Sequence, residues 1–149
     1  MKKYLLALVA AAALVSAPAY ALDLTLGGGH HAGTELNGGS VALGQQFGVV
    51  RGEVSLLSDR ADPGNYVLGV SAALPVASVG PVALAAKAGV LYTDTGVGAN
   101  GYGMKVGGEA TYVLSKEVAA VVEVSHVRNE EALRGMNGNV GLVGLRFKF

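Results

Sequence analysis

The sequence predicts an all-β protein, an eight-stranded antiparallel up-and-down transmembrane β-barrel. Three observations predict this fold. Apolar residues alternate with small or charged ones at a period of two, which places each kind on its own face of a strand. Hydrophobic residues make up 51% of the 149 residues and charged residues only 15%, whereas soluble domains carry about 25% charged residues. The chain also begins with the pattern of an export signal.

Residues 1–21 have the features of a cleaved secretory signal peptide. Two lysines near the start precede the 11-residue apolar run Leu5–Val15, and the small-residue motif AYA ends at Ala21. An N-terminal membrane anchor is the alternative, but the run is short for a bilayer core of about 30 Å. We therefore expect cleavage after Ala21 and a single barrel domain over residues 22–149.

The period of two recurs along the whole of this domain. In Gly141–Phe149, for example, every second residue is apolar and the residues between are Gly, Arg or Lys. The uncharged run Leu68–Ala86 contains Pro75 and Pro81, so we interpret it as two strands and not as a membrane helix. Longer polar links alternate with short turns, as in outer-membrane barrels. The predicted strands cover residues 22–31, 39–46, 48–58, 65–75, 81–93, 101–114, 117–128 and 138–149.

The charged residues of the strands share the face opposite the apolar residues. They are four acids and four bases, separated mainly by Gly, Ala, Ser and Thr. Such a face suits the narrow interior of an eight-stranded barrel, where each buried charge needs a partner. We predict a lumen plugged by ion pairs among Asp23, Arg51, Glu53, Lys87, Lys105, Glu109, Glu123 and Arg146. A gated proton or ion path through the same residues is the alternative.

Aromatic residues gather near the predicted strand ends. Three tyrosines fall beside the longer loops and three other aromatics fall at the opposite ends, which indicates two membrane-interface belts. The expected interface residues are Phe47, Tyr66, Tyr92, Tyr102, Tyr112 and Phe149.

The final strand ends on Phe149 with alternate apolar residues before it. This resembles the C-terminal signature of Gram-negative outer-membrane proteins, in which a terminal aromatic residue serves as the insertion signal. The chain is similar in size to the OmpA membrane domain and OmpX. Its segments Gly69–Pro81, Lys87–Thr93 and Gly101–Thr111 resemble the YfaZ-type family. These resemblances imply an outer-membrane location, contact with outer-membrane lipid and lipopolysaccharide, and insertion by the barrel insertion machinery. They imply no biochemical activity.

Two groups of residues have types that occur in chemical sites. His30 and His31 follow three glycines, but a metal site needs further converging ligands. Ser125, His126 and Glu123 invite a lipid A hydrolase interpretation, yet adjacent strand residues point to opposite faces. We expect no catalytic residues, no metal and no cofactor.

The remaining composition narrows the possible partners. Eleven basic residues balance eleven acidic ones without a basic block, so no nucleic-acid partner is expected. The absence of cysteine excludes disulfides and thiolate metal sites. Arg60, Arg128 and Arg134 near the outer rim are candidates for contact with lipopolysaccharide phosphates.

The sequence thus favours a non-enzymatic, monomeric outer-membrane barrel with a structural or surface-interaction role. A small pore or transporter is the first alternative. A soluble periplasmic β-barrel that binds a small apolar ligand is the second.

Overall fold

The computed structural model describes residues 22–62, 64–96, 98–130 and 136–149. These residues form eight β-strands, and none of them belongs to a helix long and apolar enough to cross a membrane. The predicted signal peptide and Arg134 lie outside the described residues. The strands are β1 (Leu22–His31), β2 (Leu36–Phe47), β3 (Val50–Asp59), β4 (Asn65–Val79), β5 (Val82–Thr95), β6 (Asn100–Val113), β7 (Val118–Asn129) and β8 (Gly138–Lys148).

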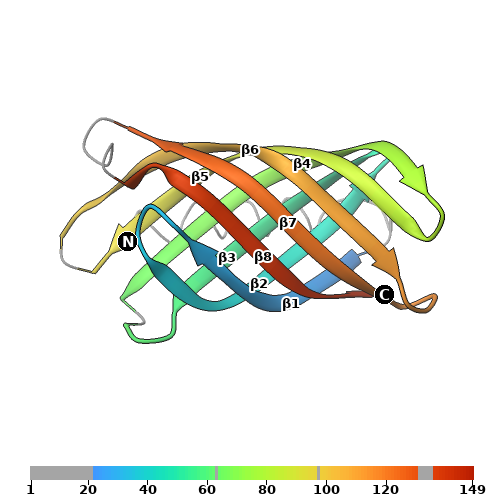
Figure 1. Cartoon of the computed structure of the whole chain (residues 1–149), viewed down its shortest axis with the longest axis horizontal. Helices are drawn as coiled ribbons and strands as arrows, with labels where there is room; N and C mark the ends of the chain where they lie inside the picture. The colour runs from blue at the N-terminus through green and yellow to red at the C-terminus, as the bar shows by residue number, and fades with distance from the viewer. Residues whose placement is uncertain (1–21, 63, 97, 131–135) are drawn as a thin grey trace.

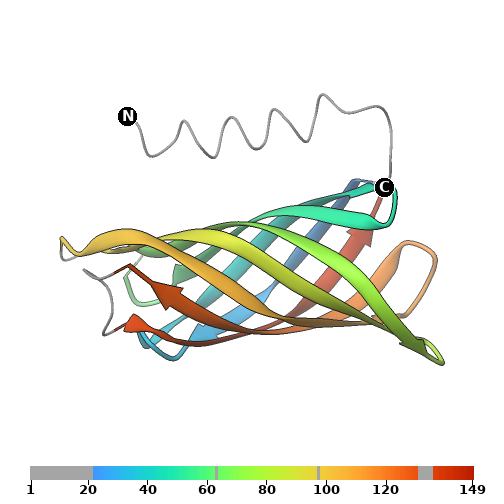
Figure 2. The ribbon, with the colours of Figure 1, turned by 90° about the horizontal axis from the view of Figure 1, so that it is seen from above.

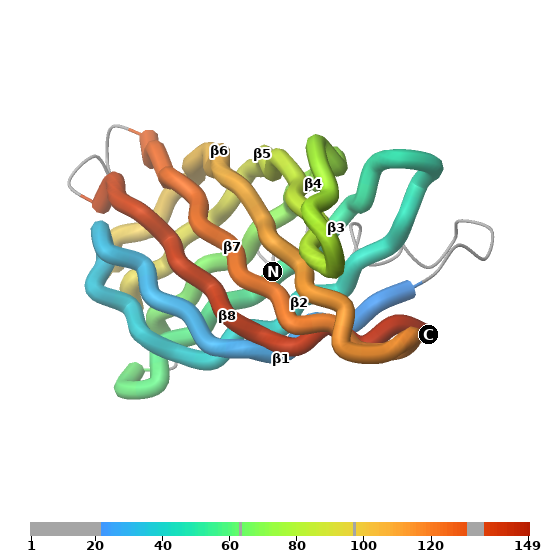
Figure 3. The backbone as a smooth tube through the Cα atoms, turned by 45° about the vertical axis from the view of Figure 1, so that its right-hand side comes forward, coloured from blue at the N-terminus to red at the C-terminus, as the bar shows by residue number. Residues whose placement is uncertain are grey.

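Each strand pairs antiparallel with the next, and β8 pairs with β1 to close the barrel. Figures 1 and 3 show the tilted strands wrapping around a single axis. Closure is directly visible in the register, where Arg146 on β8 lies opposite Thr25 on β1. The closed, antiparallel, up-and-down barrel confirms the fold class that the alternation predicts.

The two ends of the barrel differ. The links β1–β2, β3–β4, β5–β6 and β7–β8 lie at one end, here called the loop end, and the other three links lie at the turn end (Figure 1). Two of the turn-end links contain only two residues, and each begins with a glycine at positive φ, Gly48 at 60° and Gly80 at 58°. A glycine at the first position of a two-residue hairpin turn matches the right-handed twist of the strands it joins.

Two predicted strand boundaries are wrong. The second strand begins at Leu36 and not at residue 39, because Glu35 at φ 54° completes the preceding turn. The fourth strand continues through Pro75 to Val79, so the predicted link over residues 76–80 is reduced to Gly80 and Pro81. A register shift between Pro75 and Ala77 accommodates the proline, which has no N–H to donate.

Burial follows the alternation along each strand. On β7, Ala119, Val121 and Glu123 are buried, whereas Val122 and Val124 between and beside them are exposed. The same inside–outside alternation holds on β6, where Lys105 is buried and Val106 is exposed. The barrel therefore turns its charged residues inward, and most of its exposed outer surface is apolar.

Inward-facing glycines let neighbouring strands approach closely. A Cβ added at Gly107 would overlap the backbone of Val124 and Ser125 on β7. A Cβ added at the outward-facing Gly108 would meet only the Ala85 carbonyl oxygen, at 3.6 Å. Glycine at such inward positions permits the coiling that a narrow barrel requires.

Candidate functional site: the filled lumen

Eight charged side chains lie inside the barrel and are only 2–7% exposed. They come from six strands, while β2 and β4 contribute small residues to the same region. Gly44 on β2 shows why, because a Cβ there would overlap the Arg51 guanidinium. The structure brings together all the residues expected in the lumen, namely Asp23, Arg51, Glu53, Lys87, Lys105, Glu109, Glu123 and Arg146.

Lys87 is the centre of this ion-pair network. Its Nζ lies 2.6 Å from Glu53 Oε1, 2.5 Å from Glu123 Oε2 and 3.3 Å from Glu109 Oε2. The other Glu123 oxygen accepts a hydrogen bond from Lys105 Nζ at 2.9 Å. One ammonium group therefore joins carboxylates from β3, β6 and β7 across the lumen.

Two arginines extend the network toward the turn end. Arg51 binds Asp23 in a bidentate manner, with Nε–Oδ2 at 2.8 Å and Nη2–Oδ1 at 2.5 Å, and its Nη1 donates to Glu53 Oε2 at 2.6 Å. Arg146 lies between two acids, with Nη2 at 2.7 Å from Glu109 Oε1 and Nε at 3.6 Å from Asp23 Oδ1. The contacts make one continuous network from Lys105 to Arg146.

Hydroxyl groups complete the coordination of the carboxylates. Ser125 Oγ donates to Glu123 Oε1 at 2.8 Å, and Thr111 Oγ1 donates to Glu109 Oε1 at 3.3 Å. Four cations balance four anions, so each buried charge has an opposite charge to offset the free energy lost on leaving water. Removing a single member leaves a buried charge without its partner, so the network acts as a unit.

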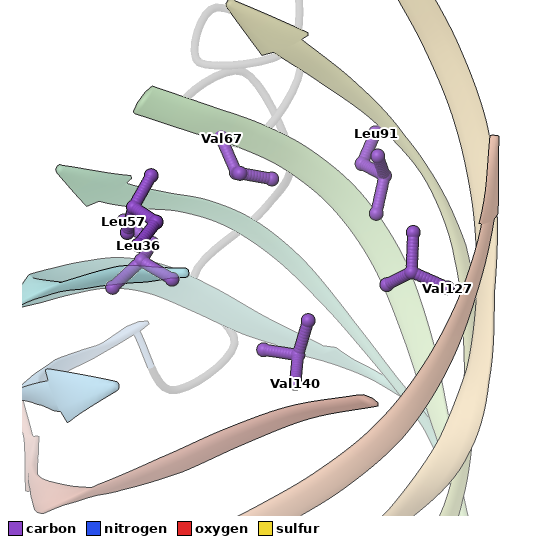
Figure 4. Close-up of a cluster of buried hydrophobic side chains, with 6 residues drawn as sticks. All are labelled: Leu36, Leu57, Val67, Leu91, Val127 and Val140. Atoms are coloured by element: carbon purple, nitrogen blue, oxygen red, sulfur yellow. The ribbon is translucent and has the colours of Figure 1, made fainter. Parts of the chain in front are cut away.

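An apolar layer fills the lumen nearer the loop end, and the sequence analysis missed it. Figure 4 shows these side chains pointing toward the barrel interior, and they belong to β2, β3, β4, β5, β7 and β8. Sequence analysis assigned apolar residues to the outer face, which is wrong here. The spacing from the inward charges could have identified these residues. Leu57, Leu91 and Val127 follow Glu53, Lys87 and Glu123 by four residues, so each lies on the same face of its strand as the charge. The layer consists of Leu36, Leu57, Val67, Leu91, Val127 and Val140.

Little empty space remains inside. A cavity of about 50 Å³ lies between the ion-pair network and the apolar layer, bordered by Ser55, Lys105 and Leu142. At the turn end, a more open pocket of about 320 Å³ reaches Arg51 and Arg146. Among the described residues, charged and aliphatic side chains thus occupy much of the lumen between the network and the loop end.

The structure separates the residues considered for hydrolysis. Ser125 faces the lumen, whereas His126 is exposed on the outer surface and its Nδ1 lies 3.0 Å from Asn139 Oδ1. His31 is buried and its Nδ1 accepts hydrogen bonds from the backbone of Gly33 and Thr34. Among the described residues, no three His, Cys, Asp or Glu side chains are grouped to hold a metal ion.

The aromatic residues lie at both ends of the strands. Tyr92 packs between Tyr66 and Tyr102 near the loop end, with ring centroids 6.3 and 5.3 Å apart. Phe47, Tyr112 and Phe149 are exposed near the turn end. Tyr102 and Tyr112 are ten residues apart on β6, which corresponds to about 25 Å along the axis of a barrel with strands tilted by about 40°.

No family model matches the chain, and no curated protein sequence matches it significantly. Solved structures do match. The N-terminal β-barrel domain of Pseudomonas aeruginosa OprF is 15% identical, with a TM-score of 0.64 over 87% of this chain and 98% of that one. The Yersinia pestis outer membrane protein Ail is 11% identical, with a TM-score of 0.58 over 88% and 100% of the two chains. Neisserial surface protein A is 17% identical, with a TM-score of 0.53 over 87% and 95%. The chain thus has the fold of the small eight-stranded barrels found in outer-membrane proteins.

Proposed function

We propose that this chain is a non-enzymatic integral protein of the Gram-negative outer membrane, a barrel whose lumen is closed by ion pairs. Its role is structural or lies in interactions at the cell surface. A single observation carries the proposal: unlike in a soluble protein, the charged residues of the strands are buried and the apolar residues are exposed. The eight network residues are at most 7% exposed, whereas Val106, Val124 and Val143 on the outside are 60–64% exposed.

The outer surface supports contact with hydrocarbon. Leu24, Leu26, Val41, Leu43 and Val143 face outward on neighbouring strands and form a continuous apolar band around β8, β1 and β2. A soluble protein rarely exposes such a band. The spacing of about 25 Å between the aromatic belts equals the height of the apolar band of outer-membrane barrels.

The filled lumen supports a structural role over transport. Ion pairs cross the middle of the barrel, and aliphatic side chains pack in the loop-end half. An eight-stranded barrel has an interior that side chains can fill completely. Small-molecule sites usually measure about 300–1,000 Å³, so the cavity of about 50 Å³ between the network and the apolar layer is too small for a ligand held deep in the lumen.

Further parts of the proposal come from sequence alone. The turn end faces the periplasm and the loops face outward, as in other outer-membrane barrels. Cleavage of the signal peptide after Ala21, recognition of Phe149 by the insertion machinery, a monomeric state and YfaZ-type membership remain predictions. The partners proposed are outer-membrane lipid and lipopolysaccharide.

Membrane insertion is tested by fractionation together with gel mobility. We expect the protein in the outer-membrane fraction, extractable only with detergent. Its unheated form should migrate differently from the heated form, because a closed barrel resists unfolding by detergent at room temperature. Recovery from the periplasm without detergent would overturn the proposal and favour the soluble barrel.

Closure of the lumen is tested by conductance in planar bilayers. We expect no sustained current from the purified wild-type protein, since the network and the apolar layer leave no continuous water path. Insertion is verified on the same sample by protease protection. Sustained single-channel steps from inserted protein would contradict the plug and favour a small pore.

A further inference from the structure

The pocket of about 320 Å³ at the turn end, here called the turn-end pocket, has the size of a ligand site. Small-molecule sites usually measure about 300–1,000 Å³. The pocket is bordered on one side by the end of the β4–β5 hairpin. The β3–β4 ladder ends at Ala73, whereas β4 stays paired with β5 as far as Val79 (Figure 2). The hairpin therefore forms one wall of the pocket, and the turn-end residues of the ion-pair network form its floor.

The wall of the turn-end pocket is apolar, and most of its side chains are short. Three alanines of β4 and β5 leave space that larger side chains would fill, and none of the wall residues carries a charge. A ligand in the pocket therefore meets aliphatic groups on this side. The wall consists of Ala73, Pro75, Ala83, Leu84, Ala85 and, from β6, Val113.

The floor and rim of the pocket carry a surplus of one positive charge. The lining contains three cations, Arg51, Arg146 and Lys148, and two acids, Asp23 and Glu109. Lys148 accounts for the surplus. It lies opposite Asp23 in the β1–β8 ladder, but both carboxylate oxygens of Asp23 are bound by Arg51. In the described part of the chain, no carboxylate forms an ion pair with Lys148.

Arg146 has hydrogen-bonding capacity left, although only 5% of it is exposed. Its Nη2 lies 2.7 Å from Glu109 Oε1 but forms no well-directed hydrogen bond with a described residue. Its hydrogen bonds to the hydroxyl groups of Thr25 and Thr111 are long, at 3.2 and 3.4 Å. Arg146 and Lys148 are two residues apart on β8, so they share one face of the strand. A guanidinium group carries five N–H donors, so Arg146 can bind a further acceptor beside Lys148.

The charge and the wall together determine the class of ligand. A surplus of one positive charge favours a monoanion, because Asp23 and Glu109 would repel a dianion such as phosphate. A carboxylate has two oxygens, which can accept from an ammonium group and from a guanidinium group at the same time. The apolar wall favours an aliphatic group next to that carboxylate over a sugar.

We propose that the turn-end pocket binds a small aliphatic monocarboxylate, with the carboxylate at Lys148 and Arg146 and the aliphatic tail against the β4–β5 wall. The site requires only the closed barrel and does not depend on the outer-membrane location. In the orientation proposed above, the pocket opens toward the periplasm.

A nuclear magnetic resonance titration of the isotope-labelled barrel in detergent micelles tests the site. Hexanoate is the probe, and the comparison ligands are hexanamide, which is neutral and equally long, and inorganic phosphate. We expect saturable shifts of the backbone signals of Thr111, Val113 and Lys148 with hexanoate only. Lys148→Gln should weaken hexanoate binding about threefold or more, because it removes the surplus cation. Ala83→Leu should weaken it at least as much by filling space beside the wall.

Two variants outside the pocket are the matched controls. Lys116→Gln removes an exposed lysine at the same end of the barrel, and Ala88→Leu adds an outward leucine on β5. Neither residue lines the pocket, so both variants should bind hexanoate like the wild type. The gel mobility of each unheated variant verifies that the barrel has formed.

Four outcomes would overturn the site or its ligand class. Unchanged binding by both Lys148→Gln and Ala83→Leu would overturn the site. Equal binding of hexanamide would overturn the requirement for an anion, and equal binding of phosphate would overturn the requirement for an aliphatic group. Shifts confined to outward residues such as Val106 would show that hexanoate only enters the micelle. A barrel that inserts in the outer membrane but does not bind hexanoate refutes this site and leaves the proposed function intact.

Discussion

Substitution of Lys87 by Met is expected to cost about 3–5 kcal/mol of unfolding free energy, the range measured when one partner of a buried ion pair is removed. Lys87 contacts Glu53, Glu109 and Glu123 within 3.3 Å. Met has a similar volume, so the cavity it leaves is small and the loss is electrostatic. Three carboxylates would then share fewer cations inside the barrel. Equilibrium urea unfolding of the protein in phospholipid vesicles measures the change.

Two further variants separate the loss of the buried Lys87 ion pairs from the effect of replacing any lysine by methionine. Lys116→Met removes an exposed lysine in the β6–β7 turn and should change the unfolding free energy by less than about 0.5 kcal/mol. Adding Glu123→Gln to Lys87→Met restores charge balance and should recover part of the loss. If Lys87→Met unfolded at the wild-type urea concentration, the lumen would be hydrated and the plug would not exist.

Substitution of Gly107 by Ala is expected to destabilise the barrel by about 3 kcal/mol. The added methyl group would overlap the backbone of Val124 and lie 2.6 Å from Ser125 Oγ. Main-chain atoms of a paired strand cannot move aside without breaking the ladder between β6 and β7. The urea midpoint should fall, and the folded, faster-migrating gel form should be lost at lower temperature.

The neighbouring glycine provides the control. Gly108→Ala faces outward, where the nearest atom to a Cβ is 3.6 Å away. It should be neutral or slightly stabilising, because alanine restricts the unfolded chain more than glycine does. Equal losses at the two positions would show that the destabilisation comes from strand propensity and not from close approach.

The alternation, together with the low charge, the export signal and the aromatic residues near strand ends, was enough to predict the closed antiparallel barrel and the side of each strand that faces inward. Lys105 and Val106 are adjacent in sequence but occupy opposite faces, as the period of two requires. Sequence could not give the contacts among the charges. Lys87 meets acids from three other strands, and those contacts depend on the register between strands and on side-chain reach.

The apolar layer escaped prediction for a different reason. The prediction placed charged and small residues on the inner face, so it made no provision for apolar residues such as Leu57 and Leu91, which share that face four residues beyond an inward charge. The extension of β4 beyond Pro75 escaped because proline normally ends a central strand. Here the β3–β4 ladder has already ended at Ala73, so β4 is paired only with β5 at Pro75.

That extension gives the barrel a projecting strand edge at the turn end. Beyond Ala73, residues of β4 pair with β5 but not with β3, and Figure 2 shows this hairpin reaching past the turn end. Leu74, Val76 and Val79 are exposed along it, and an open apolar edge invites strands of other molecules to pair with it. Pro75 withholds a donor there, and the irregular register at Ala77 bends the strand. Pro75 thus makes this edge a poorer template for pairing with strands of other molecules.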